Sequence, residues 1–124
     1  MGNFRNLLIW QKAMLLVTDI YETSKSFPKE EIFGLTSQIR RCAISIPSNI
    51  SEGYGRNSNQ EFIRYLNISI GSLFELQTQI EIAYNIGYYN EESFKKMYDQ
   101  TRELEIMTVS FLNKIKTRTQ DLST

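Results

Sequence analysis

Histidine is absent from the chain, and cysteine occurs once, at Cys42. The absence of histidine excludes imidazole as a general base and as a zinc ligand. A lone cysteine excludes an internal disulfide and a cysteine-rich metal site, and one free thiol is consistent with a reducing compartment. We therefore expect no metal, no cofactor and no histidine-based catalysis.

Net charge and long apolar runs are also lacking. The 14 Lys and Arg residues balance the 14 Asp and Glu residues, whereas nucleic-acid-binding domains are usually basic overall. A local basic patch stays compatible with this balance. No run approaches the ~20 apolar residues of a membrane span, and the N-terminal stretch does not resemble a signal peptide. We predict a cytoplasmic protein with no membrane segment, folded as one domain over residues 1–124.

Glycine and proline are sparse, with six and two residues, and most of them fall between segments of helical periodicity. The periodicity predicts helices over about residues 9–26, 35–52, 58–87 and 90–118, with the third beginning at a capping box at Ser58 and ending near Gly87. Residues 119–124 are polar and are expected to be frayed. No segment alternates with a period of two. Short connections between four helices predict an all-α, antiparallel up-down-up-down four-helix bundle.

Pro47 falls in the middle of the second predicted helix, within the run SIPSNIS. A proline there leaves the carbonyl of Ala43 without its usual hydrogen bond and kinks the helix, at a cost of about 3 kcal/mol. We expect a proline-kinked second helix in which hydroxyls of nearby serines bond the freed carbonyl. The polar side of this helix is either a solvated face or a contact with another subunit.

The third predicted helix carries a second apolar row beside its heptad seam. An additional apolar face indicates self-association, although a wide stripe facing the core also explains it. We combine this row with the polar side of the second helix as one hypothesis for the subunit contact. The predicted oligomer interface consists of Arg41, Ser45, Pro47, Ser48, Glu52, Ile63, Ile70 and Phe74.

Charge is distributed unevenly along the chain. Residues 1–56 hold seven basic and five acidic side chains, residues 57–110 four and eight, and residues 111–124 three and one. The predicted nucleic-acid contacts are Arg40, Arg41, Arg56, Lys114, Lys116 and Arg118. Aromatic residues are scarce beside them, so the sequence does not support base stacking. Trp10, at the start of the first helix, is either an anchor for a partner or a cap on the end of the core.

The chain has no arrangement of side chains that indicates catalysis. Glu52, Glu75 and Glu81 lack a nucleophile or metal partner in the sequence pattern. Cys42 lies on the apolar stripe of the second helix, so we interpret it as a small core residue. We predict that the protein is not an enzyme.

Several motifs along the chain resemble one bacterial protein family. They are WQKA at 10–13, FP at 27–28, GL at 34–35, QIRR at 38–41, SIPSNI at 45–50, EG at 52–53 and GSLFEL at 71–76. Over nearly its whole length the chain resembles the four-helix-bundle family encoded within intervening sequences of 23S ribosomal RNA genes. Cys42 and Ser51 stand where this pattern usually has alanine, and both are small.

The resemblance implies a bundle that assembles into a homopentameric barrel and has no enzymatic activity. It also implies kinship with the accessory variability determinant of diversity-generating retroelements, which works with a reverse transcriptase and binds nucleic acid through a basic surface. We accordingly expect a homo-oligomeric scaffold that binds RNA or DNA as an accessory to an RNA-processing or reverse-transcribing enzyme. The alternative is a protein-interaction ring that binds no nucleic acid.

Overall fold

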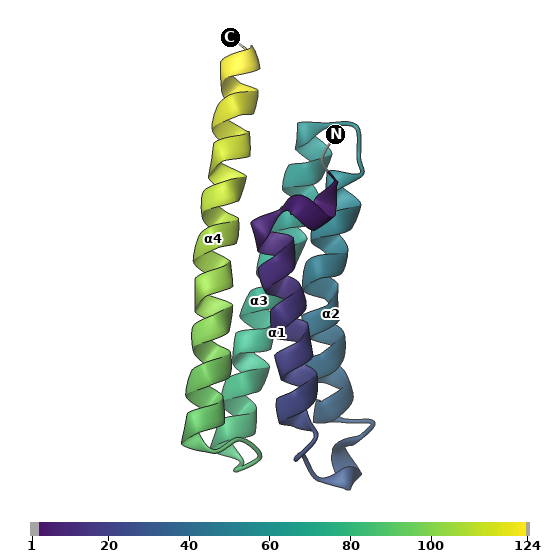
Figure 1. Ribbon diagram of the computed structural model, residues 1–124, viewed down its shortest axis with the longest axis vertical. Coiled ribbons are helices and arrows are strands. Elements are labelled where there is room, and N and C mark those ends of the chain that lie inside the picture. The colour runs from purple at the N-terminus through teal and green to yellow at the C-terminus, as the bar shows by residue number, and fades with distance from the viewer. Residues whose placement is uncertain (1–2, 124) are drawn as a thin grey trace.

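The computed structural model describes residues 3–123, with side chains described through Arg118, and contains no strand in that range. Its elements are η1 (Phe4–Asn6), α1 (Leu8–Ser24), η2 (Lys29–Glu31), α2 (Leu35–Tyr54), α3 (Asn59–Asn85) and α4 (Glu91–Ser123) (Figure 1). The all-helical prediction is confirmed. The predicted end of the last helix is wrong, because α4 continues past Arg118 through Ser123. Thr124 lies outside the described residues.

The four α-helices pack side by side around one apolar core. Helix α2 contacts α1 and α3, and α4 contacts the same two helices. Fully buried side chains come from every helix, among them Leu16, Ile46, Leu73 and Leu104. In Figure 1 the α2–α3 connection lies at the same end as the N-terminus and the C-terminal end of α4. We call this the upper end; the α1–α2 and α3–α4 connections lie at the lower end.

Local sequence signals explain where α3 begins and ends. The Ser58 hydroxyl accepts a hydrogen bond from the Glu61 backbone N–H at 3.1 Å, as a serine N-cap does. The Glu61 carboxylate pairs instead with Arg64 at 3.0 Å, so only the serine half of the predicted capping box forms. Beyond the last turn, Gly87 has a φ of 85°, a left-handed conformation that glycine adopts without steric cost.

Helix α2 runs as one helix through Pro47. The Ser45 hydroxyl donates to the carbonyl of Cys42 at 2.8 Å, and the Ser51 hydroxyl donates to the carbonyl of Ser48 at 3.0 Å. Neither hydroxyl bonds the carbonyl of Ala43, for which Pro47 has no backbone N–H to donate. The prediction that nearby serine hydroxyls bond the Ala43 carbonyl is therefore wrong for Ser45 and Ser51, because each of these hydroxyls bonds the carbonyl three residues before it.

Candidate nucleic-acid interface

The six cationic residues predicted to contact nucleic acid lie in three places. Arg40 and Arg41 lie in the lower half of α2, Arg56 lies in the α2–α3 connection, and the other three lie near the end of α4. Arg40 and Arg56 are separated by roughly 24 Å along the axis of α2, at a helical rise of 1.5 Å per residue. One copy of the protein therefore does not gather all six residues into one patch.

Two of these arginines are engaged within the protein. The Arg40 Nε donates to the Ser24 hydroxyl at 2.9 Å, and its guanidinium lies 4.7 Å from the centre of the Tyr21 ring. Arg56 forms an ion pair with Glu52 at 3.0 Å. This hydrogen bond with Glu52 is the main reason that the pKa of Arg56 rises above its usual value. Arg56 stays charged, but its charge is balanced locally, so it is a weak candidate for binding phosphate.

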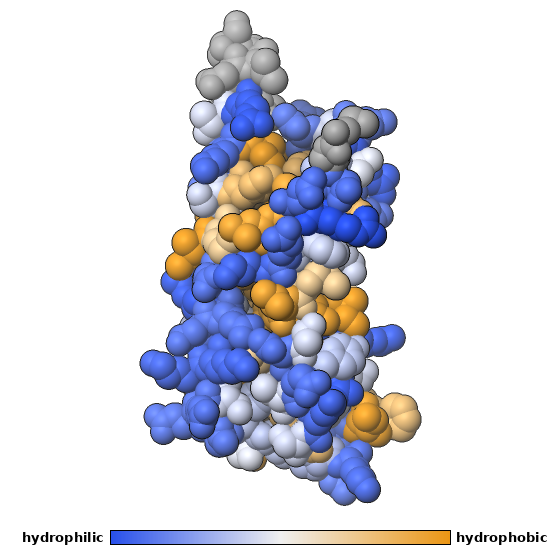
Figure 2. Space-filling view, viewed as in Figure 1, coloured by the Kyte–Doolittle hydropathy of each residue, from blue (hydrophilic) through white to orange (hydrophobic). Residues whose placement is uncertain are grey.

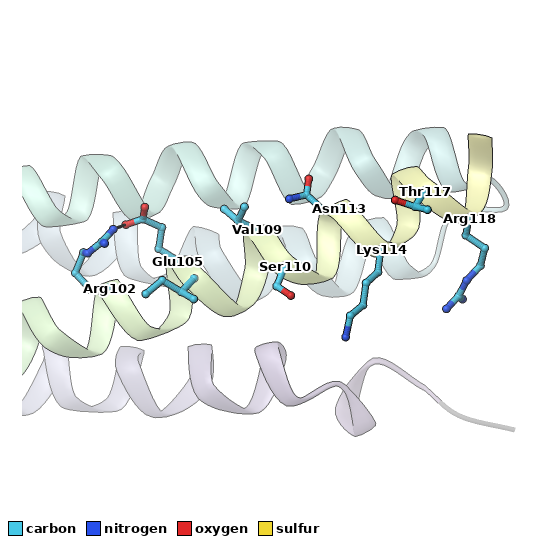
Figure 3. A pocket seen from close by; sticks show the side chains of 9 residues that line it. Arg102, Glu105, Val109, Ser110, Asn113, Lys114, Thr117 and Arg118 are labelled. Atoms are coloured by element: carbon cyan, nitrogen blue, oxygen red, sulfur yellow. Dashed lines mark hydrogen bonds and ion pairs between the residues drawn. The ribbon is translucent and has the colours of Figure 1, made fainter. Parts of the chain in front are cut away.

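The upper half of α4 presents a shallow groove whose nine lining residues all come from this helix (Figure 3). Ser110, Lys114 and Arg118 point to one side of the helix, and Asn113 and Thr117 point to the other. Cationic, hydroxyl and amide side chains are the types that contact phosphate oxygens in nucleic-acid complexes. This surface therefore has the chemistry expected of a phosphate-binding site.

Among the described side chains, no acid forms an ion pair with the positive charge at this end of α4. We call Lys114, Lys116 and Arg118 the α4 cationic cluster; all three are exposed, and none forms an ion pair with a described residue. The two acidic residues of α4 that lie nearest below the cluster are already paired. Glu105 pairs with Arg102 at 2.7 Å, and Glu103 pairs with Lys12 at 2.9 Å.

A second groove, which the sequence motifs did not predict, lies between α1 and α2 toward the upper end. Its volume is about 400 Å³. We call it the Trp10 groove, and it is lined by Phe4, Arg5, Trp10, Met14, Val17, Ile44, Pro47, Ser48 and Ser51. Trp10 and Pro47 are far apart in the chain, and only the packing of α1 on α2 brings them together. The helical spacing of Trp10, Met14 and Val17 is the one sequence signal for this surface, and it does not indicate a contact with α2.

Two predicted interface residues make contacts within one copy of the chain. Ile70 is 9% exposed and belongs to the core, and the Ser45 hydroxyl lies 2.6 Å from the Ser72 hydroxyl of α3. The burial of Ile70 does not favour a subunit contact there, because α3 packs against both α2 and α4. Ser45 stays partly exposed, and its place in a subunit contact stays a prediction. A helix between two neighbours needs a wide apolar stripe, which explains Ile63 and Ile70 of the second row without another subunit, whereas Phe74 is 50% exposed.

The other predicted interface residues differ in exposure. Pro47 is buried at the floor of the Trp10 groove, and Ile63 is partly buried against the core. The remaining four, which stay accessible on the surface, are Arg41, Ser48, Glu52 and Phe74.

Apolar side chains nevertheless remain on the surface in other places. Figure 2 shows them over α1 and α4 and at the α1–α2 connection of the lower end. Leu15 is 61% exposed and Ile106 is 59% exposed, while Phe33 in the lower connection is 95% exposed. Apolar surface of this kind is typical of contacts with another protein chain.

The buried cysteine is unsuited to nucleophilic chemistry. The Cys42 Sγ donates to the carbonyl of Ser72 at 3.1 Å. Burial, with a smaller contribution from Glu75, raises the pKa of the Cys42 thiol to about 12, so the thiol stays protonated at neutral pH. Over the described residues, no three side chains of metal-binding type come together. No described helix combines the length and apolarity needed to cross a membrane.

Comparisons with known proteins agree with this architecture. The sequence model of the 23S rRNA-intervening sequence protein family matches residues 5–110. A crystal structure of a protein of unknown function from the S23 ribosomal protein family of Bacteroides thetaiotaomicron superposes with a TM-score of 0.80. The two sequences are 23% identical over 86% of this chain and 96% of that chain, which shows a common fold. No curated protein matches the sequence. The chain belongs to the 23S rRNA-intervening sequence protein family.

Proposed function

We propose that the protein is a non-enzymatic, cytoplasmic, self-associating scaffold that binds nucleic acid through the α4 cationic cluster. The observation that carries this proposal is that Lys114, Lys116 and Arg118 are exposed and unpaired within the described chain. Uncompensated cations of this kind supply most of the affinity for a phosphate backbone. They also explain how a chain with no net charge can bind a polyanion locally.

Self-association would multiply the effect of this cluster. In a symmetric ring, which the family resemblance suggests is a pentamer, each cluster is repeated and the local positive potential grows. The exposed apolar residues Leu15, Ile106 and Phe33 support contacts between copies. Within each copy we propose an antiparallel up-down-up-down bundle whose second helix bends at Pro47. In Figure 1 the three connections between the helices lie in turn at the lower, upper and lower end of the molecule, which supports this topology.

The proposed role is that of an accessory protein. The scaffold would hold RNA or DNA for a separate RNA-processing or reverse-transcribing enzyme, which would supply the chemistry. The accessory role rests on the resemblance to the retroelement accessory proteins. The protonated Cys42 thiol, and the lack of a metal-ligand group among described residues, are compatible with it.

The test removes three charges from the cluster and, in a control, three from the opposite end. The test variant is Lys114→Gln with Lys116→Gln and Arg118→Gln. The control is Lys29→Gln with Lys95→Gln and Lys96→Gln, which are exposed residues of the lower end without an ion pair in the described chain.

Binding is measured by the fluorescence anisotropy of labelled RNA and DNA over a range of salt concentrations. We expect the test variant to bind more weakly, with a shallower salt dependence. Removing one phosphate contact should reduce the slope of log K against log salt by about 0.7 for single strands and about 0.9 for duplexes. The control should retain the wild-type slope. Equal affinities of the test variant and wild type would show that the cluster is not the binding surface.

A protein-interaction ring that binds no nucleic acid is the second candidate. The zero net charge and the nearly fully exposed Phe33 favour it. It predicts that wild-type protein leaves the anisotropy of labelled RNA and DNA unchanged even at low salt, where electrostatic binding is strongest.

A further inference from the structure

The Trp10 groove combines aromatic, aliphatic and hydroxyl side chains. Phe4 and Trp10 meet edge to face, with ring centres 5.2 Å apart. Both rings are partly exposed, while Met14 and Ile44 add aliphatic walls and Ser48 adds an exposed hydroxyl. The groove volume of about 400 Å³ lies within the range of roughly 300–1,000 Å³ that small-molecule sites occupy. The groove therefore suits a flat, largely apolar group with polar edges.

Positive charge lies in this groove, at Arg5, and on α2 one turn before it, at Arg41. The Arg5 guanidinium lies 4.6 Å from the centre of the Phe4 ring, and Arg5 has no ion pair within the described chain. Arg41, also exposed and without a described ion pair, lies one turn before Ile44 on α2. It is separated from Ser48 by about 10 Å along the helix axis. Among the described residues, no acidic side chain lines the groove. A ligand with a flat ring and flanking negative charges would match this pattern.

We infer that the Trp10 groove receives an unpaired base of single-stranded nucleic acid. The base stacks on the Trp10 ring, and the phosphates on either side contact Arg5 and Arg41. A duplex does not fit, because its bases are stacked on each other and only their edges are accessible. This inference rests on the proposed function, since it specifies which form of nucleic acid the scaffold holds.

The Trp10 groove and the α4 cationic cluster lie on two sides of the first turn of α1. Leu8 and Ile9 line a small groove together with Lys114 of α4, and Trp10 is the next residue of α1. In Figure 1 the start of α1 and the upper half of α4 lie at the same end of the molecule. A strand that contacts Lys114 can therefore continue over the start of α1 and place a base in the Trp10 groove.

Trp10 is the only tryptophan in the chain, so its fluorescence reports on this groove alone. The wild-type protein is titrated with an oligouridylate or oligodeoxythymidylate of about 15 nucleotides, near the upper site size of single-strand-binding modules. A blunt mixed-sequence duplex is titrated in parallel. Both probes also carry a label for anisotropy. We expect the single strand to quench the Trp10 emission and the duplex to leave it unchanged.

The outcomes separate this inference from the proposed function. Single-strand binding by anisotropy with unchanged Trp10 emission would overturn the inference and leave the proposed function intact. No binding of either probe would reject both. Emission that changes on dilution of the protein, but not on addition of nucleic acid, would assign the groove to a second copy of the chain and overturn the inference.

Two variants test the roles of the groove residues. Trp10→Leu should weaken single-strand binding roughly tenfold or more, as expected when one base no longer stacks, and leave duplex binding unchanged. Loss of structure alone would weaken both. Since Trp10 also packs against the core, Arg5→Gln provides an independent test at an exposed residue. Arg5→Gln should lower single-strand affinity and reduce the Trp10 quenching at a given concentration, whereas Lys95→Gln at the lower end should not.

Discussion

Among individual residues, Glu31 has the clearest structural role outside the core. Its carboxylate accepts a hydrogen bond from the Tyr88 hydroxyl at 2.7 Å and another from the Leu35 backbone N–H at 3.1 Å. The bond with Tyr88 is the main reason that the pKa of Glu31 lies below its usual 4.5, and the same bond raises the pKa of Tyr88. The ionised carboxylate thus ties the α1–α2 connection to the α3–α4 connection.

This bond predicts a pH-dependent contribution to stability. We expect Tyr88→Phe to lower the free energy of unfolding at neutral pH. Because the folded-state pKa of Glu31 is depressed, the contribution is present above about pH 4.5 and is lost as the pH falls through the folded pKa. The measurement is the urea midpoint of wild type and variant from neutral to acidic pH. Tyr84→Phe, at an exposed tyrosine, is the control and should show no such pH dependence. A stability difference that stays constant across the range would contradict the assignment.

Between helices, the contact of α2 with α3 is the most extensive in the molecule. Small polar residues line it: the Ser69 hydroxyl donates to the carbonyl of Ile46 at 3.0 Å, and the Ser45 and Ser72 hydroxyls lie 2.6 Å apart. Hydroxyls that pair in this way remove the cost of burying polar groups. Ser45, which the sequence pattern assigned to another subunit, therefore holds α2 to α3 within one copy.

Two glycines provide a matched test of this contact. A Cβ atom added at Gly53 of α2 would lie 2.5 Å from the Cβ of Tyr65 on α3, whereas one added at Gly71 would meet nothing within 4 Å. We expect Gly53→Ala to destabilise the protein, because overpacking costs about 1–3 kcal/mol and exceeds the gain from replacing a helical glycine. Gly71→Ala should stabilise it by about 0.5–1 kcal/mol. Chemical denaturation measures the free energy of unfolding of both variants. A change of the same sign in both would refute the packing explanation.

For the molecule as a whole, the exposed apolar residues raise the question of assembly. Leu15 and Ile106 lie on the sides of the bundle, and Phe33 lies at its lower end. Covering such side chains would remove apolar area from water, a driving force of about 25 cal/mol per Å². Burial of this kind is insensitive to moderate salt, whereas phosphate binding is weakened by it.

Assembly is tested by light scattering of the purified protein at low and high salt. We expect a mass that is a multiple of 14.5 kDa and that persists at high salt. A further increase on adding RNA or DNA should appear only at low salt. A mass of one chain at every protein concentration would contradict the scaffold proposal. An assembly that dissociates at high salt would show that charge pairs, rather than apolar contacts, hold it together.

The amino-acid sequence was sufficient to predict the helices and several of their boundaries. Helical periodicity and the Ser58 cap are local, because they depend on residues a few positions apart. The short motifs also predicted the family correctly. For the same local reason, the sequence placed Ile70 on a helical face without showing that this face is buried in the core.

The remaining features depend on how each helix is rotated against its neighbours. Packing alone decided that Ser45 faces α3, and that Arg40 and Arg56 are engaged while the α4 cationic cluster is free of ion pairs with described residues. Packing also brought Trp10 next to Pro47, although they belong to different helices. Contacts of this kind arise between residues distant in the chain, so periodicity within one helix cannot specify them.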